Sequence, residues 1–462
     1  QLQPLLTPQF TSLRRVLLRP RQHTVVNRHR SGLLLHSAVL LLSRVSIHGG
    51  QSIALGSWPL PYAIEFAVDG LSALMVLLIA LVSTAVLIYQ ADWHETPENP
   101  GAYALLHGLV AASIAVCMAA DLFNLYVWFE LMLITVLGLF ILGGGKPHHE
   151  AALKYFTLSM LGTLLMLAAV GLIYATTGHL NFSALLLASQ DPALSGSLVI
   201  YTGLLFTALL LKIGVFPLFA WLPAAYHTLP APLLALVGGL LTKISLYVLL
   251  RLSGQVFDLQ TLNESLGWLA VITMLSGVIG AAYHWDLRRI LAFHIVSQIG
   301  YLLLGIALAS SAAATATSFF LFHNILVKAN LFLIAGLMWM AAGHYDLRRI
   351  GGLFPARPLI TLLFVISALS LVGVPPSSGF WGKLLLLQEA FAQERFVWAG
   401  IALFTGMLTL YSMSKIWLEG FWKPSPGEAI ARAVPWPAYA ATVSLSIIIL
   451  LIGLAPDFLI AY

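Results

Sequence analysis

Long apolar runs occupy most of this chain. They fall at about residues 68–89, 102–119, 122–142, 151–175, 198–228, 232–252, 265–283, 289–309, 315–341, 357–394, 398–420 and 436–459. A helix needs about 20 apolar residues to cross the hydrocarbon core of a bilayer. Because backbone groups inside lipid must bond to one another, these runs predict an all-α polytopic membrane protein. The composition agrees, with 60% apolar and 9% charged residues. Residues 31–47 and a weaker candidate before them bring the prediction to about 14 transmembrane helices.

Two of the runs are too long for one simple helix, and both are interrupted. Gly214 and Pro217 interrupt residues 198–228, and Pro375 with Pro376 interrupts residues 357–394. Proline has no amide proton and breaks or kinks a helix. Each interrupted helix is the fourth of a set of five, which indicates two inverted five-helix repeats with sites near the membrane midplane. The predicted parts are amino-terminal helices with a basic leader (1–100), a first repeat (101–252), a second repeat (264–421) and a carboxy-terminal helix (436–460).

The charges of the connecting loops predict the orientation. Basic residues lie in alternate connections, at Arg14–Arg30, Lys146, Arg288/Arg289, Arg348/Arg349/Arg357 and Lys423/Arg432. Positive loops face the cytoplasm, so both termini are expected outside a bacterial inner membrane. The heptad His284–Ile290 recurs as His344–Ile350 in two of these basic connections. Short basic turns are common cytoplasmic caps, so this repeat carries little weight by itself.

The first fifty residues are rich in arginine and contain no acidic residue. That composition is typical of an organellar transit peptide. Residues 31–47 are nevertheless long enough for a short membrane helix, which favours a degenerate or truncated amino-terminal hairpin.

Several classes of function lack their usual residues. Cys117 is the single cysteine, which excludes an intrachain disulfide and a CxxC pair. The sequence has no glycine-rich phosphate loop. The net charge of +5 is modest and indicates loop anchoring, not nucleic-acid binding. One carboxylate among several lysines would make a poor metal site, so no metal is expected.

Ionisable residues inside apolar runs are the candidate functional residues, because a charge in hydrocarbon costs about 3 kcal/mol or more. The main candidates for a proton relay are Glu130, Lys212, Lys243, His323, Lys328 and Lys383. Secondary candidates are Asp69, His227, His294 and Lys415.

Each candidate has a simpler interpretation. An ion near a helix end can extend to the membrane surface, and this is favoured for Asp121, Lys154, Glu389 and Lys415. A lone buried histidine, such as His294 or His323, is usually a hydrogen-bonded core residue. A scaffold whose charges have no present role is a further alternative.

A series of buried acids, amines and imidazoles suits proton transfer, because burial and opposing charges shift proton affinities in opposite directions. A pair between Glu130 and Lys212 would hold the lysine protonated. Separating the pair would let Lys212 pass its proton to Lys243. The sequence therefore predicts a proton relay.

Six segments resemble one family. They are GSWPLPYAIEFAVDGLSALM (56–75), FNLYVWFELMLI (123–134), LLKIGVFPLFAWLPAAYHTLPAPLLALVGGLLTKISLYVLLR (210–251), DLRRILAFHIVSQIGYLLLGIAL (286–308), LFHNILVKANLFLIAG (321–336) and GVPPSSGFWGKLLL (373–386). The chain resembles the antiporter-like membrane subunits shared by respiratory complex I, membrane hydrogenases and multisubunit cation/proton antiporters. Within that family it is most similar to the D-type subunits of Mrp antiporters.

The resemblance implies roles for individual residues. The family's motif glutamate falls on Glu130 and its broken-helix lysine on Lys212. Its following lysine falls on Lys243, its histidine–lysine helix on His323 and Lys328, and its last lysine on Lys383. The departure from the family is the basic amino terminus, where members begin with an apolar helix.

The implied function is that of a secondary-transporter subunit, not an enzyme, with no cofactor. Two half-channels would move protons, coupled to export of Na⁺ (or K⁺ or Li⁺) by hydrophobic partner subunits of the A, B, C, E, F and G types, in support of pH homeostasis. The alternative is a proton-pumping subunit of a respiratory NADH:quinone oxidoreductase or a membrane-bound hydrogenase.

Overall fold

The computed structural model describes residues 20–60, 62–90, 100–257, 261–425 and 433–460, and they are almost entirely helical. Within these residues, 12 helices are long and apolar enough to cross a membrane. The broken helix at 357–394 is additional, since each of its halves has only 15 residues. The predicted all-helical membrane fold is confirmed. Part of the weaker candidate before residue 31 lies in residues 1–19, outside the described residues.

The chain divides into two compact units, and one of the boundaries between them falls at the first predicted break, between Ile213 and Gly214. Unit 1 comprises residues 1–81, 98–213 and 241–260, and unit 2 comprises residues 82–97, 214–240 and 261–462. Two long helices, α3 (Gly70–Gln90) and α10 (Ala231–Gln255), contribute residues to both units.

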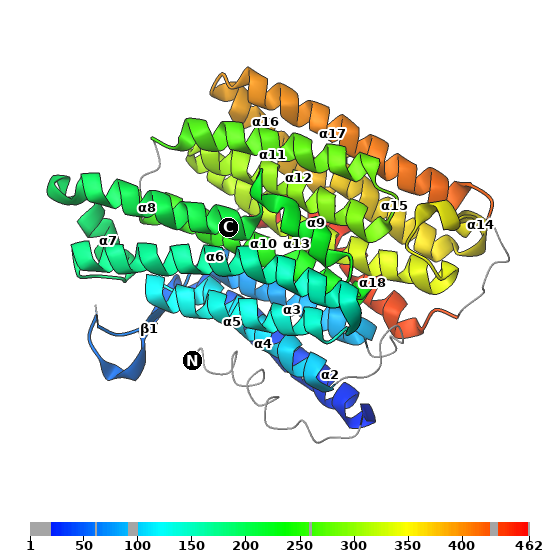
Figure 1. Ribbon diagram of the computed structural model, residues 1–462, viewed down its shortest axis with the longest axis horizontal. Coiled ribbons are helices and arrows are strands. Elements are labelled where there is room, and N and C mark those ends of the chain that lie inside the picture. Colours follow the sequence, from blue (N-terminus) through cyan, green and yellow to red (C-terminus); the bar gives the residue numbers. More distant parts are fainter. Residues whose placement is uncertain (1–19, 61, 91–99, 258–260, 426–432, 461–462) are drawn as a thin grey trace. The chain divides into compact units, whose positions relative to one another are not determined.

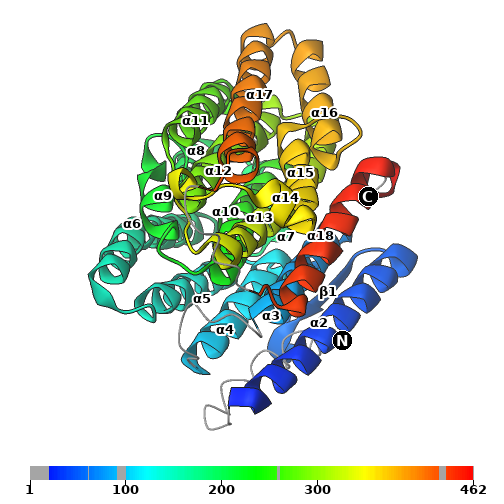
Figure 2. The same ribbon diagram turned by 90° about the vertical axis from the view of Figure 1, so that its right-hand side faces the viewer.

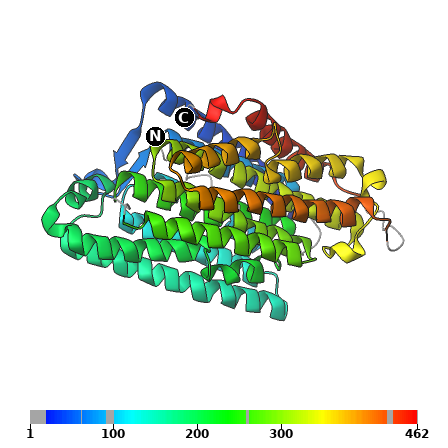
Figure 3. The ribbon, with the colours of Figure 1, turned by 90° about the horizontal axis from the view of Figure 1, so that it is seen from above.

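Unit 1 is built on long helices that pack along one another. Its further elements are α2 (Pro20–His48), β1 (Gln51–Ala54), η2 (Leu55–Ser57), β2 (Glu65–Val68), α4 (Pro100–Met118), α5 (Leu122–Ile141), α6 (Gly145–Thr177), α7 (Phe182–Ser189) and α8 (Pro192–Ile213). α6 packs against both α5 and α8 (Figure 1), and α6 and α8 run side by side when seen from above (Figure 3). The antiparallel strands β1 and β2 form a small two-stranded sheet.

Unit 2 contains the other broken helix. Its further elements are η3 (Leu218–Ala220), α9 (Trp221–Tyr226), α11 (Asn263–Tyr283), α12 (Leu287–Leu308), α13 (Ser311–Ala342), η4 (Leu347–Arg349), α14 (Leu353–Ala356), α15 (Pro358–Val372), α16 (Ser378–Ala392), α17 (Phe396–Ile416), the π-helical turn η5 (Trp417–Trp422), α18 (Trp436–Leu454) and α19 (Asp457–Ile460). α13 is packed against α15, α16 and α18 (Figure 2). α11 packs against α12 and α17.

Polar residues at helix ends account for where these helices begin. Asp121, Asp286 and Ser310 precede α5, α12 and α13, and each side chain accepts a hydrogen bond from the backbone amide three residues later. Such caps satisfy amides that have no partner within the helix. Asp121 therefore lies at a helix end, as the simpler interpretation predicts.

The repeated heptads lie against each other in unit 2. Asp286 pairs with Asp346 in an isolated antiparallel bridge. The amide of Leu287 donates to the carbonyl of Tyr345, and the amide of Leu347 donates to the carbonyl of Trp285, at 2.9 and 3.0 Å. The two copies thus exchange equivalent hydrogen bonds, so the repeat joins the start of α12 to the segment after α13.

Candidate functional site

The first predicted break separates α8 from α9. α8 ends at Ile213, and Gly214 follows with a φ of +83°. A positive φ is strained for residues with a side chain, which explains the glycine. Pro217 cannot donate a backbone hydrogen bond, and a short 3-10 turn follows it. The break at Gly214 and Pro217 is therefore as predicted.

Lys212 lies in the last turn of α8, with 8% of its surface exposed. Its amine donates a 2.7 Å hydrogen bond to the hydroxyl of Thr163 on α6. The amine also lies 5.3 Å from the centre of the Phe129 ring on α5. Gly162 permits this approach, since a Cβ there would lie 3.3 Å from Cγ of Lys212.

Glu130 follows Phe129 on α5 and is half-buried. Its carboxylate acts electrostatically on Lys212. Within the described part of unit 1, however, no salt bridge joins the two residues, and Oε2 of Glu130 is buried without a hydrogen-bond partner. The expected direct pair is thus not formed, because the Lys212 amine bonds to Thr163 instead.

Lys243 is fully buried in α10, and Tyr247 and Arg251 follow at four-residue intervals on the same helix. Arg251 forms a 3.0 Å salt bridge with Asp69 at the start of α3 and also donates to the Tyr247 hydroxyl. Burial alone would raise the pKa of Asp69, but the charge and hydrogen bonds of Arg251, together with Ser72, lower it. Asp69 therefore has a structural partner, Arg251, that sequence reasoning missed.

The second break separates α15 from α16. α15 ends at Val372, Gly373 has a φ of +90°, and α16 begins at Ser378 after Pro375 and Pro376. The amine of Lys383, on α16, turns back to donate to the carbonyls of Leu371 and Val372 at 3.1 and 2.7 Å. Lys383 thus satisfies the open carboxyl end of α15.

His323 and Lys328 are both buried in α13. His323 bonds through Nδ1 to the hydroxyl of Ser378, 2.9 Å away, and Ser378 lies 3.0 Å from the hydroxyl of Ser370. Three polar side chains from α13, α15 and α16 therefore meet at the second break. The serines were not predicted, although Ser378 belongs to the break motif itself.

The secondary histidine candidates have defined partners in unit 2. His294 on α12 bonds through Nε2 to the hydroxyl of Ser412 on α17 at 2.9 Å. His227 donates from Nδ1 to the carbonyl of Pro223 and accepts at Nε2 from Arg289, so its ring is neutral. Burial and the Arg289 charge lower the pKa of His227 to about 4.

The remaining charged candidates lie at helix ends or on the surface. Lys154 is exposed on α6, and Glu389 near the end of α16 accepts hydrogen bonds from Ser310 and Gln393. Lys415, near the end of α17, donates to the carbonyls of Ala282 and His284. Glu389 and Lys415 thus lie near helix ends, whereas Lys154 lies on the exposed face of α6.

The fold and these positions define an antiporter-like membrane protein: long spanning helices, two of them broken, with a buried lysine beside each break. The family model described as "NADH:quinone oxidoreductase/Mrp antiporter, TM" matches residues 119–409. The chain belongs to this family, as the sequence analysis predicted.

Relatives with named functions are similar over most of the chain. The Na(+)/H(+) antiporter D subunit of Bacillus subtilis (strain 168) is 34% identical over 431 residues, which cover 92% of this chain and 87% of that protein. The Na(+)/H(+) antiporter D subunit of Alkalihalophilus pseudofirmus is 36% identical over 394 residues, covering 85% and 80%.

Solved structures share the fold. A chain of the Mrp complex from Dietzia sp. DQ12-45-1b superposes with a TM-score of 0.90 at 29% identity, covering 99% of this chain and 94% of that one. A chain of respiratory complex I from Thermus thermophilus has a TM-score of 0.82 at 24% identity, covering 100% and 98%, and it shows the fold alone.

Proposed function

We propose that this chain is the D-type subunit of an Mrp-type Na⁺/H⁺ antiporter and that it translocates protons through buried ionisable side chains. The observation that carries the proposal is the buried lysine beside each helix break, Lys212 at the first and Lys383 at the second. The two relatives named as D subunits of Na⁺/H⁺ antiporters support the choice of transporter over the redox complexes.

The surroundings of Lys212 suit a residue that gains and loses a proton. Its amine is bonded to a neutral hydroxyl, and the acid acting on it, Glu130, is half-buried and unbonded at Oε2. Protonation of Glu130 would remove the opposing charge and favour release of the lysine proton. Lys243, also in unit 1, is the proposed acceptor. In unit 2, Lys383, His323 and Lys328 continue the relay.

The finer features of the predicted architecture belong to the same proposal. The chain has about 14 spans in two inverted five-helix repeats, and both termini lie outside a bacterial inner membrane. Hydrophobic subunits of the A, B, C, E, F and G types complete the complex, and they couple proton entry to Na⁺ export.

Exchange by the purified complex in sealed vesicles tests the relay. Lys212→Ala and Glu130→Ala are expected to abolish Na⁺-dependent proton exchange while the complex still assembles. Lys154→Ala is the matched control, because that lysine is exposed on α6 and has no proposed role. Wild-type exchange in both relay variants would refute the proposal. Flavin or iron–sulfur subunits in the purified complex would instead indicate the redox alternative.

A further inference from the structure

The last long helix, α18, packs against the helices that form the second break. Its neighbours in unit 2 are α13, α15 and α16. The buried residues of α18 form one stripe along the helix: Ala438, Ala441, Thr442, Leu445, Ser446, Ile449 and Gly453. None of the relay candidates lies on α18. Any effect of this helix on proton transfer must therefore act through its three neighbours.

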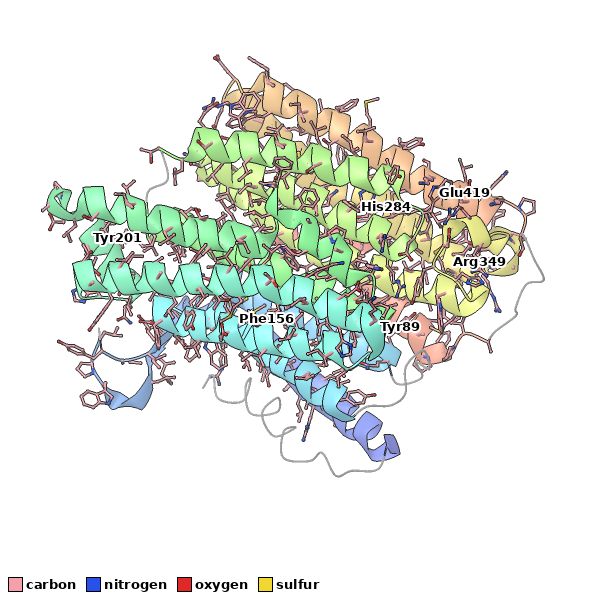
Figure 4. All side chains as sticks on the ribbon, in the orientation of Figure 1. Tyr89, Phe156, Tyr201, His284, Arg349 and Glu419 are labelled. Carbon is pink, nitrogen blue, oxygen red and sulfur yellow. The ribbon has the colours of Figure 1, made fainter. Side chains whose placement is uncertain are left out.

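The helices α15 and α18 begin at the same end of unit 2. The amide of Gly352, before α15, donates a 2.6 Å hydrogen bond to the carbonyl of Lys423, before α18. Arg349 and Glu419 belong to the turns that precede these two residues, and Figure 4 shows them at the same end of the helices. The two helices therefore run in the same direction from that end.

The other end of α18 touches the second break itself. Gly453 is the second-last residue of the helix. A Cβ at Gly453 would lie 2.6 Å from the carbonyl oxygen of Pro376 and 2.8 Å from the amide nitrogen of Ser378. These distances are too short for any side chain, so the backbone of α18 lies directly against the backbone of the break. Glycine permits this close approach because it has no Cβ.

A tryptophan side chain joins the same two elements. Trp381 on α16 donates from Nε1 to the carbonyl of Gly453 at 2.9 Å. Carbonyls in the last turn of a helix have no partner within the helix, so the indole satisfies one at the end of α18. Lys383, two residues later on α16, does the same for Leu371 and Val372 at the end of α15. Two neighbouring side chains of α16 thus hold the carboxyl ends of two helices.

A second connection lies on the other side of the break from α16. Asn330 on α13 is fully buried, and its Nδ2 donates to the hydroxyls of Ser367 on α15 and Ser446 on α18, at 2.9 and 2.8 Å. One amide group therefore joins three helices. Asn330 follows His323 by seven residues, about two helical turns, so both lie on the same face of α13. The face that carries the histidine of the break thus also carries the residue that fixes α15 and α18.

The polar character of this connection suits positioning better than it suits stability. Hydrogen bonds between membrane helices add little to stability, and apolar side chains would pack three helices without any polar group to satisfy. A hydrogen bond, however, fixes both a distance and a direction between the groups that it joins. Asn330 and Trp381 therefore restrain α18 more narrowly than apolar packing would.

We propose that Asn330 and Trp381 are positioning residues, which hold α18 against the second break. They thereby fix Ser378 and Lys383 in the relay of unit 2. This inference rests on the proposed function, because it names the residues that set the geometry of that relay. The helix α18 moves no proton itself. It keeps the end of α15 within reach of the Lys383 amine and keeps Ser378 within reach of His323. Proton transfer needs hydrogen-bond reach, so loosening α18 slows transfer even when every relay residue is present.

Exchange in sealed vesicles, expressed per assembled complex, tests the role of Trp381. Trp381→Phe keeps an aromatic ring but removes the N–H donor, and the maximal rate of Na⁺-dependent proton exchange is expected to fall by about tenfold. The Na⁺ concentration that gives half of the maximal rate should not change, since α18 acts on proton transfer alone. Trp436→Phe is the matched control, because Trp436 is exposed at the start of α18. An unchanged maximal rate in Trp381→Phe would overturn the proposal.

Ser446 tests the role of Asn330 by conservative rescue. Ser446→Ala loses one bond to Asn330 and is expected to slow exchange by about threefold or more, whereas Ser446→Thr keeps the hydroxyl and should stay within about twofold of the unmodified complex. Ser444→Ala is the matched control, because Ser444 is exposed and bonds only to the carbonyl of Ala441 in its own helix. Adding Ser446→Ala to Asn330→Leu should slow exchange no further, since both changes remove the same bond. Additive losses would overturn the role of Asn330.

Lys383→Ala separates failure of this inference from failure of the proposed function. If Lys383→Ala abolishes exchange while Trp381→Phe and Ser446→Ala exchange normally, positioning by α18 is refuted and the relay stands. If Lys383→Ala exchanges like the unmodified complex, the proposed relay of unit 2 fails, and positioning by α18 fails with it. A lower melting temperature of Trp381→Phe with an unchanged rate per complex would show a merely structural contact and would also overturn the proposal.

Discussion

Gly379 lies where the two halves of the second broken helix approach each other closely. It is the second residue of α16, and a Cβ added there would overlap the backbone carbonyl oxygen of Ser370 on α15. The same Cβ would lie 2.9 and 3.0 Å from two atoms of the His323 ring. A backbone carbonyl cannot rotate away from a clash as a side chain can, so Gly379→Ala must separate α15 from α16.

The expected cost follows from two opposing effects. Alanine is favoured over glycine inside a helix by about 0.5–1 kcal/mol. Overpacking costs about 1–3 kcal/mol, and a backbone clash belongs at the upper end of that range. Gly379→Ala is therefore expected to destabilise the protein by about 2 kcal/mol. Separation of the half-helices would also lengthen the hydrogen bond between His323 and Ser378, so proton exchange is expected to fall.

Thermal unfolding of the detergent-solubilised complex measures the stability change, and vesicle exchange measures the loss of function. Gly400→Ala is the matched control, because Gly400 lies in α17 and a Cβ there would meet nothing within 4 Å. The control is expected to be neutral or slightly stabilising. The reasoning is refuted if Gly379→Ala melts at the temperature of the unmodified complex and exchanges protons at the same rate.

Three further predictions concern individual contacts. Thr163→Val removes the hydroxyl that accepts a hydrogen bond from Lys212. A hydrogen bond to a charged group contributes about 1.5–3 kcal/mol, so proton exchange should slow in the vesicle assay. Thr163→Ser keeps the hydroxyl and should keep proton exchange in the same assay. Asp69→Asn leaves the mostly buried Arg251 without its anion and should lower the free energy of unfolding by about 1–2 kcal/mol at pH 7. The loss is no larger because Asp69 is partly exposed. Equal melting temperatures of the variant and the unmodified complex would contradict this. The pKa of His227 is lowered to about 4 in the folded protein. As the pH falls, His227 therefore becomes protonated in the unfolded chain before it does in the folded protein. The contribution of His227 to stability should be complete above pH 6.5 and decline toward pH 4 by about 1–2 kcal/mol, less than the full shift implies because solvent screens the partly exposed ring. Melting curves of His227→Gln should lack that decline.

The helices and their breaks could be predicted because they depend on local sequence. Apolar runs set the spans, and a proline inside a run removes a helical hydrogen bond whatever the tertiary contacts of the chain. Lys212 and Lys383 could be found as candidates for the same reason, since a charge inside an apolar run is visible without any knowledge of the fold.

The partners of those residues could not be predicted, because they come from distant parts of the chain. Thr163 lies 49 residues before Lys212, and Ser412 lies 118 residues after His294. Serine and threonine occur throughout membrane helices and commonly bond to their own backbone, so nothing local distinguishes these two. The pairing of the repeated heptads was missed for the same reason, since similarity of two segments does not show that they touch.

The two break lysines have different positions and different partners. Lys212 belongs to the last turn of α8, whereas Lys383 comes from the following half-helix and bonds to the last carbonyls of α15. The carboxyl end of a helix carries about half a negative charge. A break inside a membrane span therefore creates a negative end at a depth where the chain has few acids.

A helix end differs from a carboxylate in a way that suits proton transfer. Its carbonyls do not titrate, so they remain acceptors whether Lys383 is charged or neutral. A neutral amine still has two N–H groups, enough to keep both carbonyls of α15 bonded after the proton has left. Loss of the proton thus weakens two hydrogen bonds without leaving an isolated buried charge. In the proposed relay, a lysine at a helix break would therefore release and regain a proton without the large cost of separating an ion pair in a membrane.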